Sequence, residues 1–272
     1  MATRMYAHLL AVLSVAATAA PAAAQHYRGH RADCDNSGDR RYEHYCDTRA
    51  MGWRGGHAPI SVDASPNGGV TVTGWDRDSV DVAVTVHAQA PTMDEARSLA
   101  AQVEVSSTGG VLRATGPESR HDHSWWVSYD ISAPAHSDLT LRTLNGPVEV
   151  DHVTGVMDLR AENGPLTLDE VGGDVRARLE NGPLHVTLSG TSWSGEGLDA
   201  ETVNGPAVLE VPDGYNADLE AGTVNGPMDL GMPVTVQGRF GSGAQRIHTT
   251  LGHGGPTVRV VTTNGPAVLQ RR

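Results

Sequence analysis

His121, Asp122 and His123 form the short stretch whose residue types and spacing most clearly could do chemistry. Residues two apart on a strand point the same way, so the two imidazoles could share a metal ion. A polar loop before a strand explains the same residues without a third ligand, and both interpretations stay open. Trp125 and Trp126 follow directly. They cannot both face a core, so one of them could form a sugar-stacking or packing surface.

The only two cysteines, Cys34 and Cys46, lie in a polar segment that is rich in Arg, Asp and His. In an oxidising compartment such a pair is expected to form a disulfide. The alternative is a Cys2His2 zinc site with His30 and His44, although this spacing is not a familiar finger spacing. The haem-attachment motif CxxCH is absent, so no c-type haem is expected.

Asp151, Asp169 and Glu170 are the carboxylates that could do acid–base work, because they lie near successive corners of the repeats described below. Glycosidases use paired carboxylates, and on parallel β-helices such groups converge in a groove walled by long loops. Here the repeats are short, so solvated corner acids are the favoured interpretation. All 20 basic residues are arginine, which excludes lysine-based catalysis. We therefore expect no catalytic residues and no cofactor, with a carbohydrate-active enzyme as the alternative.

The first 24 residues have the form of a secretory signal, in which Arg4 precedes an apolar run and Ala22 and Ala24 precede the cleavage point. Removing them takes away one base and no acid, so 32 acidic and 19 basic residues give a net charge of −13. Such a charge argues against nucleic acid or anionic lipid as a partner. No later segment approaches the roughly 20 apolar residues of a membrane-spanning helix. The sequence predicts a protein of the periplasm or the cell exterior.

The tripeptide Asn-Gly-Pro occurs six times in the second half of the chain. Proline disfavours the left-handed glycine of a type I′ hairpin and lacks the N–H that a sheet ladder uses. Both facts favour a corner between two sheets, with the asparagine in the φ > 0 position. The corner asparagines are Asn145, Asn163, Asn181, Asn204, Asn225 and Asn264. Their period near 20 residues predicts an all-β parallel β-solenoid of about six to seven coils, with one degenerate copy in the long last gap.

Aligning the repeats on the asparagine places apolar residues at alternate positions, as facing sheets require. Threonines two residues before the asparagine are expected to point inward, with each hydroxyl bonded to a backbone acceptor. These are Thr143, Thr202, Thr223 and Thr262. The positions between the core columns carry charges of both signs and are expected to face solvent.

The chain before the repeats has a different predicted organisation. Residues 25–56 are expected to form an irregular polar leader. Residues 57–134 are expected to form a small β-rich block with one short helix, opened by a capping box of Thr92 and Glu95. Residues 135–272 hold the repeats, and the block would cover one end of their stack.

Several motifs together resemble the bacterial putative-adhesin domain family, whose function is unknown. They are Gly74-Trp75-Asp76 at the end of a strand, Ile131 with Pro134 in a V-x-Y-x-I-x-x-P segment, and the six Asn-Gly pairs. The resemblance covers about residues 58–270, and the proline after each Asn-Gly pair departs from the family pattern. It implies a β-solenoid in the cell envelope and offers no catalytic residues.

The sequence thus predicts a non-catalytic, exported cell-envelope module with an adhesin-like binding or structural role. Its partner would be an unidentified envelope protein or polysaccharide, and the candidate binding residues are Trp125, Trp126, Arg271 and Arg272. The chain ends shortly after Leu269, so the last coil is expected to lie uncovered at the end of the stack. Weak self-association through this C-terminal coil is expected, with Arg271 and Arg272 at the contact.

Overall fold

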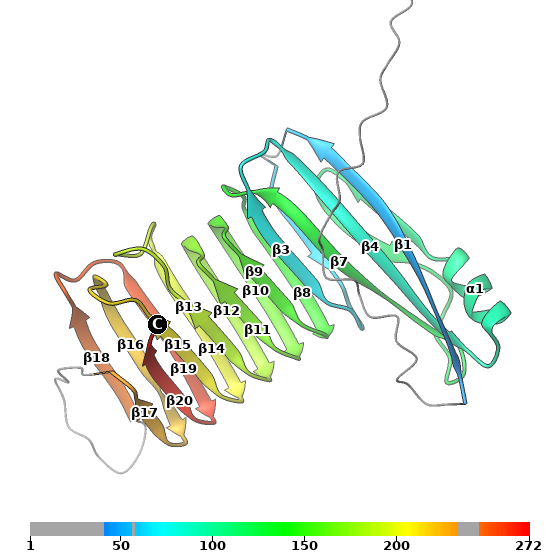
Figure 1. Ribbon diagram of the computed structural model, residues 1–272. Coiled ribbons are helices and arrows are strands. Elements are labelled where there is room, and N and C mark those ends of the chain that lie inside the picture. The colour runs from blue at the N-terminus through cyan, green and yellow to red at the C-terminus, as the bar shows by residue number, and fades with distance from the viewer. Residues whose placement is uncertain (1–40, 56–57, 233–244) are drawn as a thin grey trace, which may run out of the picture. The chain divides into compact units, whose positions relative to one another are not determined.

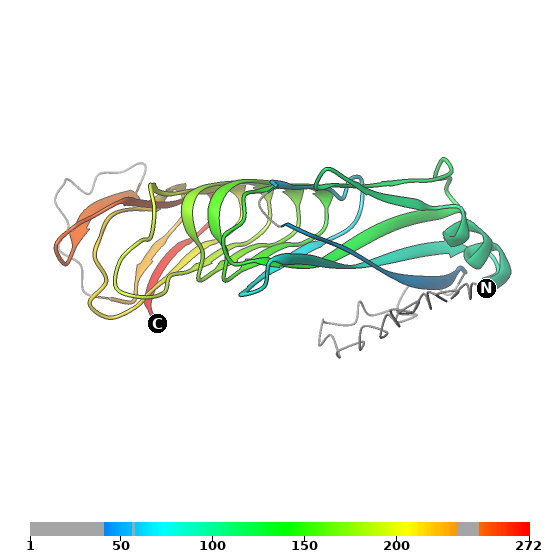
Figure 2. The ribbon, with the colours of Figure 1, turned by 90° about the horizontal axis from the view of Figure 1, so that it is seen from above.

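The computed structural model describes residues 41–55, 58–232 and 245–272, which form an all-β structure. Two ten-stranded sheets face each other across one apolar core, and Figure 2 shows them as two layers. Sheet A contains, in spatial order, β1 (Glu43–Arg54), β4 (Ser79–Ala90), β7 (Ser124–Pro134), β3 (Val70–Trp75), β9 (Val148–Asp151), β11 (Leu166–Asp169), β13 (Leu184–Thr187), β15 (Ala207–Val211), β20 (Ala267–Arg271) and β17 (Met228–Leu230). Sheet B contains β18 (Gln245–Leu251), β16 (Ala217–Asn225), β19 (Thr257–Asn264), β14 (Gly197–Asn204), β12 (Gly172–Asn181), β10 (Thr154–Asn163), β8 (Leu139–Asn145), β2 (Ile60–Asp63), β6 (Val111–Thr115) and β5 (Glu104–Thr108).

Both sheets are mixed, with parallel pairing where the repeats lie. In sheet B the strands from β8 to β16 pair in parallel, and the corner asparagines are aligned across all of them. In sheet A the strands from β3 to β17 also pair in parallel. Antiparallel pairs lie outside this region, between β1, β4 and β7, between β5 and β6, and between β16 and β18.

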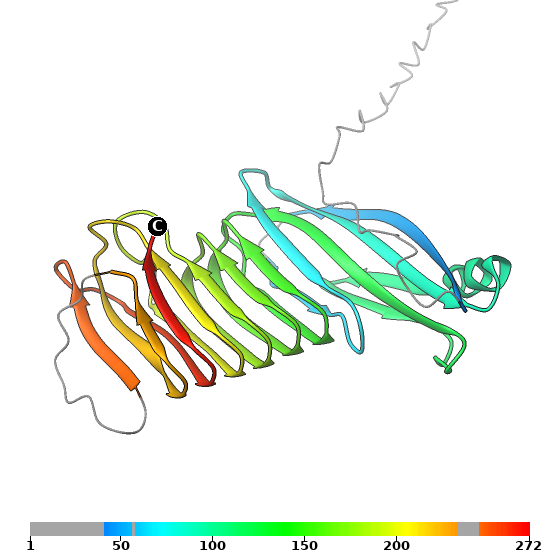
Figure 3. The same ribbon diagram turned by 60° about the horizontal axis from the view of Figure 1, so that its bottom comes forward.

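The last repeat does not lie at the end of the stack. β19 lies between β14 and β16, and β20 lies between β15 and β17. Figures 1 and 3 show this as the red β20 lying between a yellow strand and an orange one. The prediction of an uncovered C-terminal coil is therefore wrong, because Leu269 is fully buried between two neighbouring coils. The expected degenerate copy is also wrong for the described residues, since the long gap holds β18, which runs antiparallel to β16.

The Asn-Gly-Pro corners turn at the glycine and not, as expected, at the asparagine. Five of the six corner glycines have φ between +135° and +157°, and no corner asparagine has a positive φ. A Cβ on Gly182 would lie 2.1 Å from the carbonyl oxygen of Gly164, and one on Gly205 would lie 2.0 Å from that of Gly182. The coils therefore touch through their backbones at this edge, which only glycine allows.

The asparagine side chains form a continuous hydrogen-bonded ladder along the same edge. Each Nδ2 donates to the Oδ1 of the asparagine in the next coil, at distances of 2.8–3.0 Å. The ladder has a seventh member, Asn67, whose corner reads Asn-Gly-Gly and was not recognised from the sequence. In spatial order its members are Asn67, Asn145, Asn163, Asn181, Asn204, Asn264 and Asn225.

The predicted threonine column is confirmed. All four side chains are at most 4% exposed. Each hydroxyl donates to the carbonyl of a corner glycine in the neighbouring coil, at 2.7–3.1 Å. The column therefore stabilises the corners from inside, as the asparagine ladder does from outside.

The N-terminal part of the described chain confirms the helix and corrects the leader. Thr92 and Glu95 form the predicted capping box of α1 (Met93–Ala101). Residues 43–54, assigned to the irregular leader, instead form β1, because alternate apolar residues such as Met51 and Trp53 pack against the core. The signal-like residues 1–24 lie outside the described residues. In the described part of the chain, α1 is the only helix, and it is too short to cross a membrane.

Candidate functional site

Three surfaces of the repeat region combine exposed polar groups: the Asn-Gly-Pro edge, the opposite edge, and the outer face of sheet B. The Asn-Gly-Pro edge is the row of corners at which the arrowheads of the sheet B strands end in Figure 1. We call the opposite edge, where the chain returns from sheet A to sheet B, the variable edge. Its connections after β9, β11, β13 and β15 contain two, two, nine and five residues.

The asparagines and prolines of the Asn-Gly-Pro edge are uncharged, and the exposed Glu162 and Glu180 lie beside them. All seven ladder asparagines are exposed, and so are five of the six prolines, Pro206 being half-buried. The backbone N–H that follows each proline donates to the proline carbonyl of the next coil, at 2.9–3.0 Å, as from Val148 to Pro165. The ring side chains take no part in this ladder, so they are available to contact a ligand.

The variable edge is charged and irregular. His152 and Glu170 occupy equivalent corners with φ of 56° and 51°, and their side chains form an ion pair of 3.2 Å. Nδ1 of His152 lies 2.5 Å from Asp151, and Glu170 also accepts from Arg272 at 2.7 Å. The hydrogen bond to Asp151 raises the pKa of His152, burial opposes this shift, and the charges of Asp151, Glu170 and Asp169 add to it. The structure thus brings the three predicted corner acids together, and it pairs two of them with cations.

The terminal arginines lie at the variable edge and not at the end of the stack. Arg271 forms an ion pair of 2.7 Å with Asp213, and Arg272 reaches Glu170 as well as the carbonyl of Leu188. Their assignment to an end-on contact is therefore wrong, because both side chains make contacts within this chain. The hydrogen bond that Arg272 donates to Glu170 raises the pKa of Arg272.

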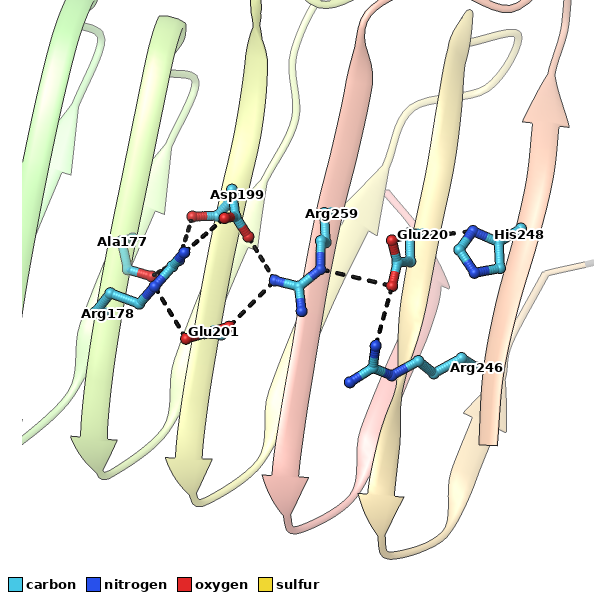
Figure 4. Close-up of polar contacts among 8 residues, drawn as sticks. All are labelled: Ala177, Arg178, Asp199, Glu201, Glu220, Arg246, His248 and Arg259. Atoms are coloured by element: carbon cyan, nitrogen blue, oxygen red, sulfur yellow. Dashed lines mark hydrogen bonds and ion pairs between the residues drawn. The ribbon is translucent and has the colours of Figure 1, made fainter. Parts of the chain in front are cut away.

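The outer face of sheet B carries an ion-pair network that crosses five strands (Figure 4). Arg178 binds Asp199 at 2.6 Å and Glu201 at 2.9 Å. Arg259 binds the same two acids from the other side, at 2.5 and 3.2 Å, and reaches Glu220 at 3.5 Å. Arg246 and His248 of β18 complete the network through Glu220.

The position of the last repeat places a basic residue between two acids of this network. Because β19 lies between β14 and β16, Arg259 separates Asp199 from Glu220. Without it, these two acids would face each other on adjacent strands, which is unfavourable. Burial alone would raise the pKa of Asp199, but the hydrogen bonds from Arg178 and Arg259 outweigh it, so the net pKa is lowered. Asp199 is therefore held ionised, and all three acids are paired with arginines, which makes this network structural.

Of the candidate metal-binding residues just before β7, only Asp122 and His123 contact each other. His121 and Asp122 are exposed, and Nδ1 of His123 pairs with Asp122 at 3.1 Å. Among the described residues, no group of three or more His, Cys, Asp or Glu side chains is arranged to hold a metal ion. The pair His121 and His123 gains no third ligand there.

Trp125 and Trp126 are both half-buried. The indole N–H of Trp125 donates to the carbonyl of Pro117 at 2.7 Å. Trp126 stacks on His87 with ring centroids 5.1 Å apart and contacts His44 edge-on. Both rings are thus engaged by the chain itself, although they line one side of a shallow depression with Tyr129.

His87 is a buried histidine that the sequence did not single out. It is 8% exposed, and its Nδ1 lies 3.3 Å from the sulfur of Cys46. Burial, followed by the charge of His44, lowers its pKa. Cys34 and His30 lie outside the described residues, so the disulfide between Cys34 and Cys46 and the zinc alternative stay predictions.

Comparison with known proteins yields structural similarity alone. No protein-family model and no curated protein matches the chain. Among solved structures, it is similar to a putative cell adhesion protein from Clostridium sporogenes, with 10% identity and a TM-score of 0.40, over 84% of this chain and 100% of that one. A putative adhesin from Bacteroides fragilis has 11% identity and a TM-score of 0.35, over 84% and 97%.

A third similar structure is a putative lipid binding protein from Parabacteroides distasonis, with 10% identity and a TM-score of 0.26, over 84% and 96% of the two chains. The names of the first two agree with the resemblance to putative-adhesin domains that the motifs indicated. At these identities and TM-scores the likeness carries no information about function.

Proposed function

We propose that this protein is an exported, non-catalytic module of the cell envelope that binds an envelope polymer or protein through its repeat region. The observation that carries the proposal is the Asn-Gly-Pro edge, a row of exposed amides and prolines in equivalent positions on successive coils. Export to the periplasm or the cell exterior is supported by the signal-like residues 1–24.

The repeat region is proposed to act as a parallel β-solenoid of seven coils. The support is the matched register of the corner asparagines and the parallel pairing on both sheets. A stack of this kind presents each surface position once per coil, at the strand spacing of about 4.8 Å. Extended partners suit such a surface better than small molecules do.

Catalysis is the less favoured function because two of the three candidate acids are occupied. Asp151 and Glu170 are held by His152 and Arg272, and side-chain exposures of 30% and 24% leave them open to solvent. A general acid needs a desolvated site, whereas both of these carboxyls are partly exposed and paired with basic side chains. A carbohydrate-active enzyme on the same scaffold remains the alternative.

The test is a screen of the purified mature chain against envelope and plant polysaccharides and envelope extracts, with binding and new reducing or unsaturated ends read in parallel. Binding without new chain ends is expected. New ends that disappear in a double variant, Asp169→Asn with Glu170→Gln, would establish the enzymatic alternative instead. Binding to no component of any panel would refute the proposed function.

A further inference from the structure

The side chains of the Asn-Gly-Pro edge retain hydrogen-bonding capacity after the ladder is complete. An amide side chain has two N–H donors and an oxygen with two lone pairs. Each ladder oxygen, from Asn67 to Asn264 in spatial order, accepts one bond and keeps its second lone pair. Asn181, Asn204, Asn225 and Asn264 also keep one N–H that has no partner among the described residues. Exposed acceptors therefore recur once per coil, whereas Asn145 and Asn163 use both of their N–H groups within the chain.

Proline lies next to these amides in six coils. Five of the rings are exposed, and their carbonyls, not the rings, make the backbone ladder. In the first coil Gly69 takes this position, and a Cβ there would lie 2.8 Å from the ring of Pro147. The rings form a narrow, rigid, apolar strip beside the polar one, because proline has no flexible side chain to order on binding.

The fold itself does not require this uniformity of side chains. The same coils turn at the variable edge with connections of two to nine residues, where charged, aromatic and small side chains all occur. Glycine is explained at the corners by the close contact of the backbones, and asparagine in part by its ladder. Proline stiffens the corner, but this role does not require the ring to be exposed in five of the six corners, and a periodic ligand would account for that repetition.

The chemistry of the edge selects an uncharged ligand. The residues that precede the corner asparagines include the exposed Glu162 and Glu180, which would repel a polyanion along this strip. No aromatic side chain lies in the ladder or the proline strip, so the base-stacking contacts of a single-stranded nucleic acid are absent. Hydroxyl groups and C–H faces of neutral sugars match amides and prolines.

We propose that the Asn-Gly-Pro edge binds a neutral, extended β-linked polysaccharide, with one sugar residue per coil. The coil spacing of about 4.8 Å is close to the length of one pyranose in such a chain. Each sugar hydroxyl pair would meet one ladder amide, and each C–H face would lie on a proline ring. This inference rests on the proposed binding function and names the class of its ligand and the residues that contact it.

The first experiment measures the dependence of binding on ligand length. Cello-, xylo- and chito-oligosaccharides of two to ten residues are titrated calorimetrically against the mature chain. Since the ladder has seven members, affinity should rise with each added sugar and level off near seven residues. Affinity that levels off at two or three sugars would indicate a compact subsite and overturn the inference.

The second experiment blocks the strip without touching the ladder. Pro183→Glu adds a charge and a flexible side chain at an exposed position in the middle of the edge. It should weaken the binding of a seven-residue oligosaccharide about tenfold or more, the scale of one lost hydrogen bond. Val156→Glu is the matched control, because Val156 is 59% exposed near the variable edge. Thermal unfolding of both variants should match the parent.

The outcomes separate this inference from the proposed function. Oligosaccharide binding that Pro183→Glu leaves unchanged would overturn the inference, as would binding by the parent of anionic polymers or nucleic acid in preference to neutral glycans. In either case a binding function would stand. A parent that binds no glycan and no envelope component would refute the function together with the inference.

Discussion

At the Asn-Gly-Pro edge every repeat turns with the same three residues, whereas at the variable edge the connections differ in length, charge and conformation. Close backbone contact occurs at both. A Cβ on Gly182 would collide with Gly164 at the first edge, and one on Gly173 would lie 2.0 Å from the oxygen of Gly155 at the second. Stacking therefore demands small residues at both edges, but only one edge repeats its other side chains.

At the variable edge, the stacking of the repeats tolerates different side chains, including charged residues in left-handed backbone conformations. His152 and Glu170 take left-handed conformations that glycine would adopt more easily, and their side chains pair with each other and with Arg272. Such residues cost of order 1 kcal/mol or more in backbone strain, which the ion pairs offset in part. The comparison indicates that stacking of the repeats requires the glycines. The repetition of proline at the Asn-Gly-Pro edge needs a different explanation.

The largest expected loss of stability comes from Gly182→Ala, which disrupts the backbone contact between Gly182 and Gly164 in neighbouring repeats. The new Cβ would lie 2.1 Å from a backbone oxygen that cannot move away, at φ of +148°. We expect a loss of about 3 kcal/mol or more in the free energy of unfolding, measured by urea denaturation. Gly190→Ala is the matched control in the variable edge, since no atom lies within 4 Å of its Cβ position and only the strain of φ +71° remains. Equal losses in the two variants would contradict the close contact.

The next effect comes from interrupting the asparagine ladder. Asn181→Ala removes the bond to Asn163 and the bond from Asn204. Two hydrogen bonds at a solvent-exposed edge correspond to about 1–2 kcal/mol of stability. Glu170→Gln, which weakens the ion pairs of the variable edge, should cost less than about 1 kcal/mol. A larger loss of stability in Glu170→Gln than in Asn181→Ala would show that the variable edge contributes more to the stability of the stack.

Replacing the prolines should hardly affect stability. Pro165→Ala keeps the backbone carbonyl that accepts from Val148 and removes only the exposed ring. The loss should be about 0.5 kcal/mol, because the unfolded chain becomes more flexible. Chemical denaturation of the single variant and of the pair Pro165→Ala and Pro183→Ala checks this. A loss of several kcal/mol would mean that the prolines are structural, and would remove the main argument for a ligand at this edge.

The smallest effect is a pH dependence confined to the variable edge. Hydrogen bonding to Asp151 raises the folded-state pKa of His152 above the ordinary histidine value of 6.5. The stabilisation is therefore complete below pH 6.5 and is lost as the pH rises through the folded-state pKa. Denaturation midpoints between pH 5.5 and 8.5 should fall less steeply in His152→Gln than in the parent. An identical slope in both proteins would remove His152 as the source.

Local and periodic features of the sequence were sufficient for much of the fold. The inward threonines, the capping box of Thr92 and Glu95, and the charged outer columns all follow from residue type and spacing. The conformation of the corner did not follow, because the close approach of Gly182 to Gly164 depends on the distance between coils. Asn67 was missed because glycine replaces the proline in its corner.

The candidate site residues were partly misplaced because the sequence does not reveal which strands are neighbours in the sheets. Arg271 and Arg272 were assigned to an open end because the sequence order of the repeats was taken as their spatial order. The spatial order brings together charges that are distant in the sequence, since Arg259 lies between Asp199 and Glu220. β1 was missed because its apolar residues alternate with many charged ones. His87 could have been noticed as a polar residue inside the long alternating run of β4.

The position of the last repeat has a consequence for how the chain matures. Strands β16 and β17 precede β19 and β20 in the chain, yet β19 and β20 are the strands with which they pair in parallel. The earlier repeats can add one after another, but the repeat of Asn225 has no place to dock until residues 257–271 lie between it and the repeat of Asn204. Long-range closure of this kind is slow and exposes unpaired strands meanwhile. A chain that stops before β19 would therefore leave β16 and β17 without their parallel neighbours, so the stack closes only when the last repeat is present.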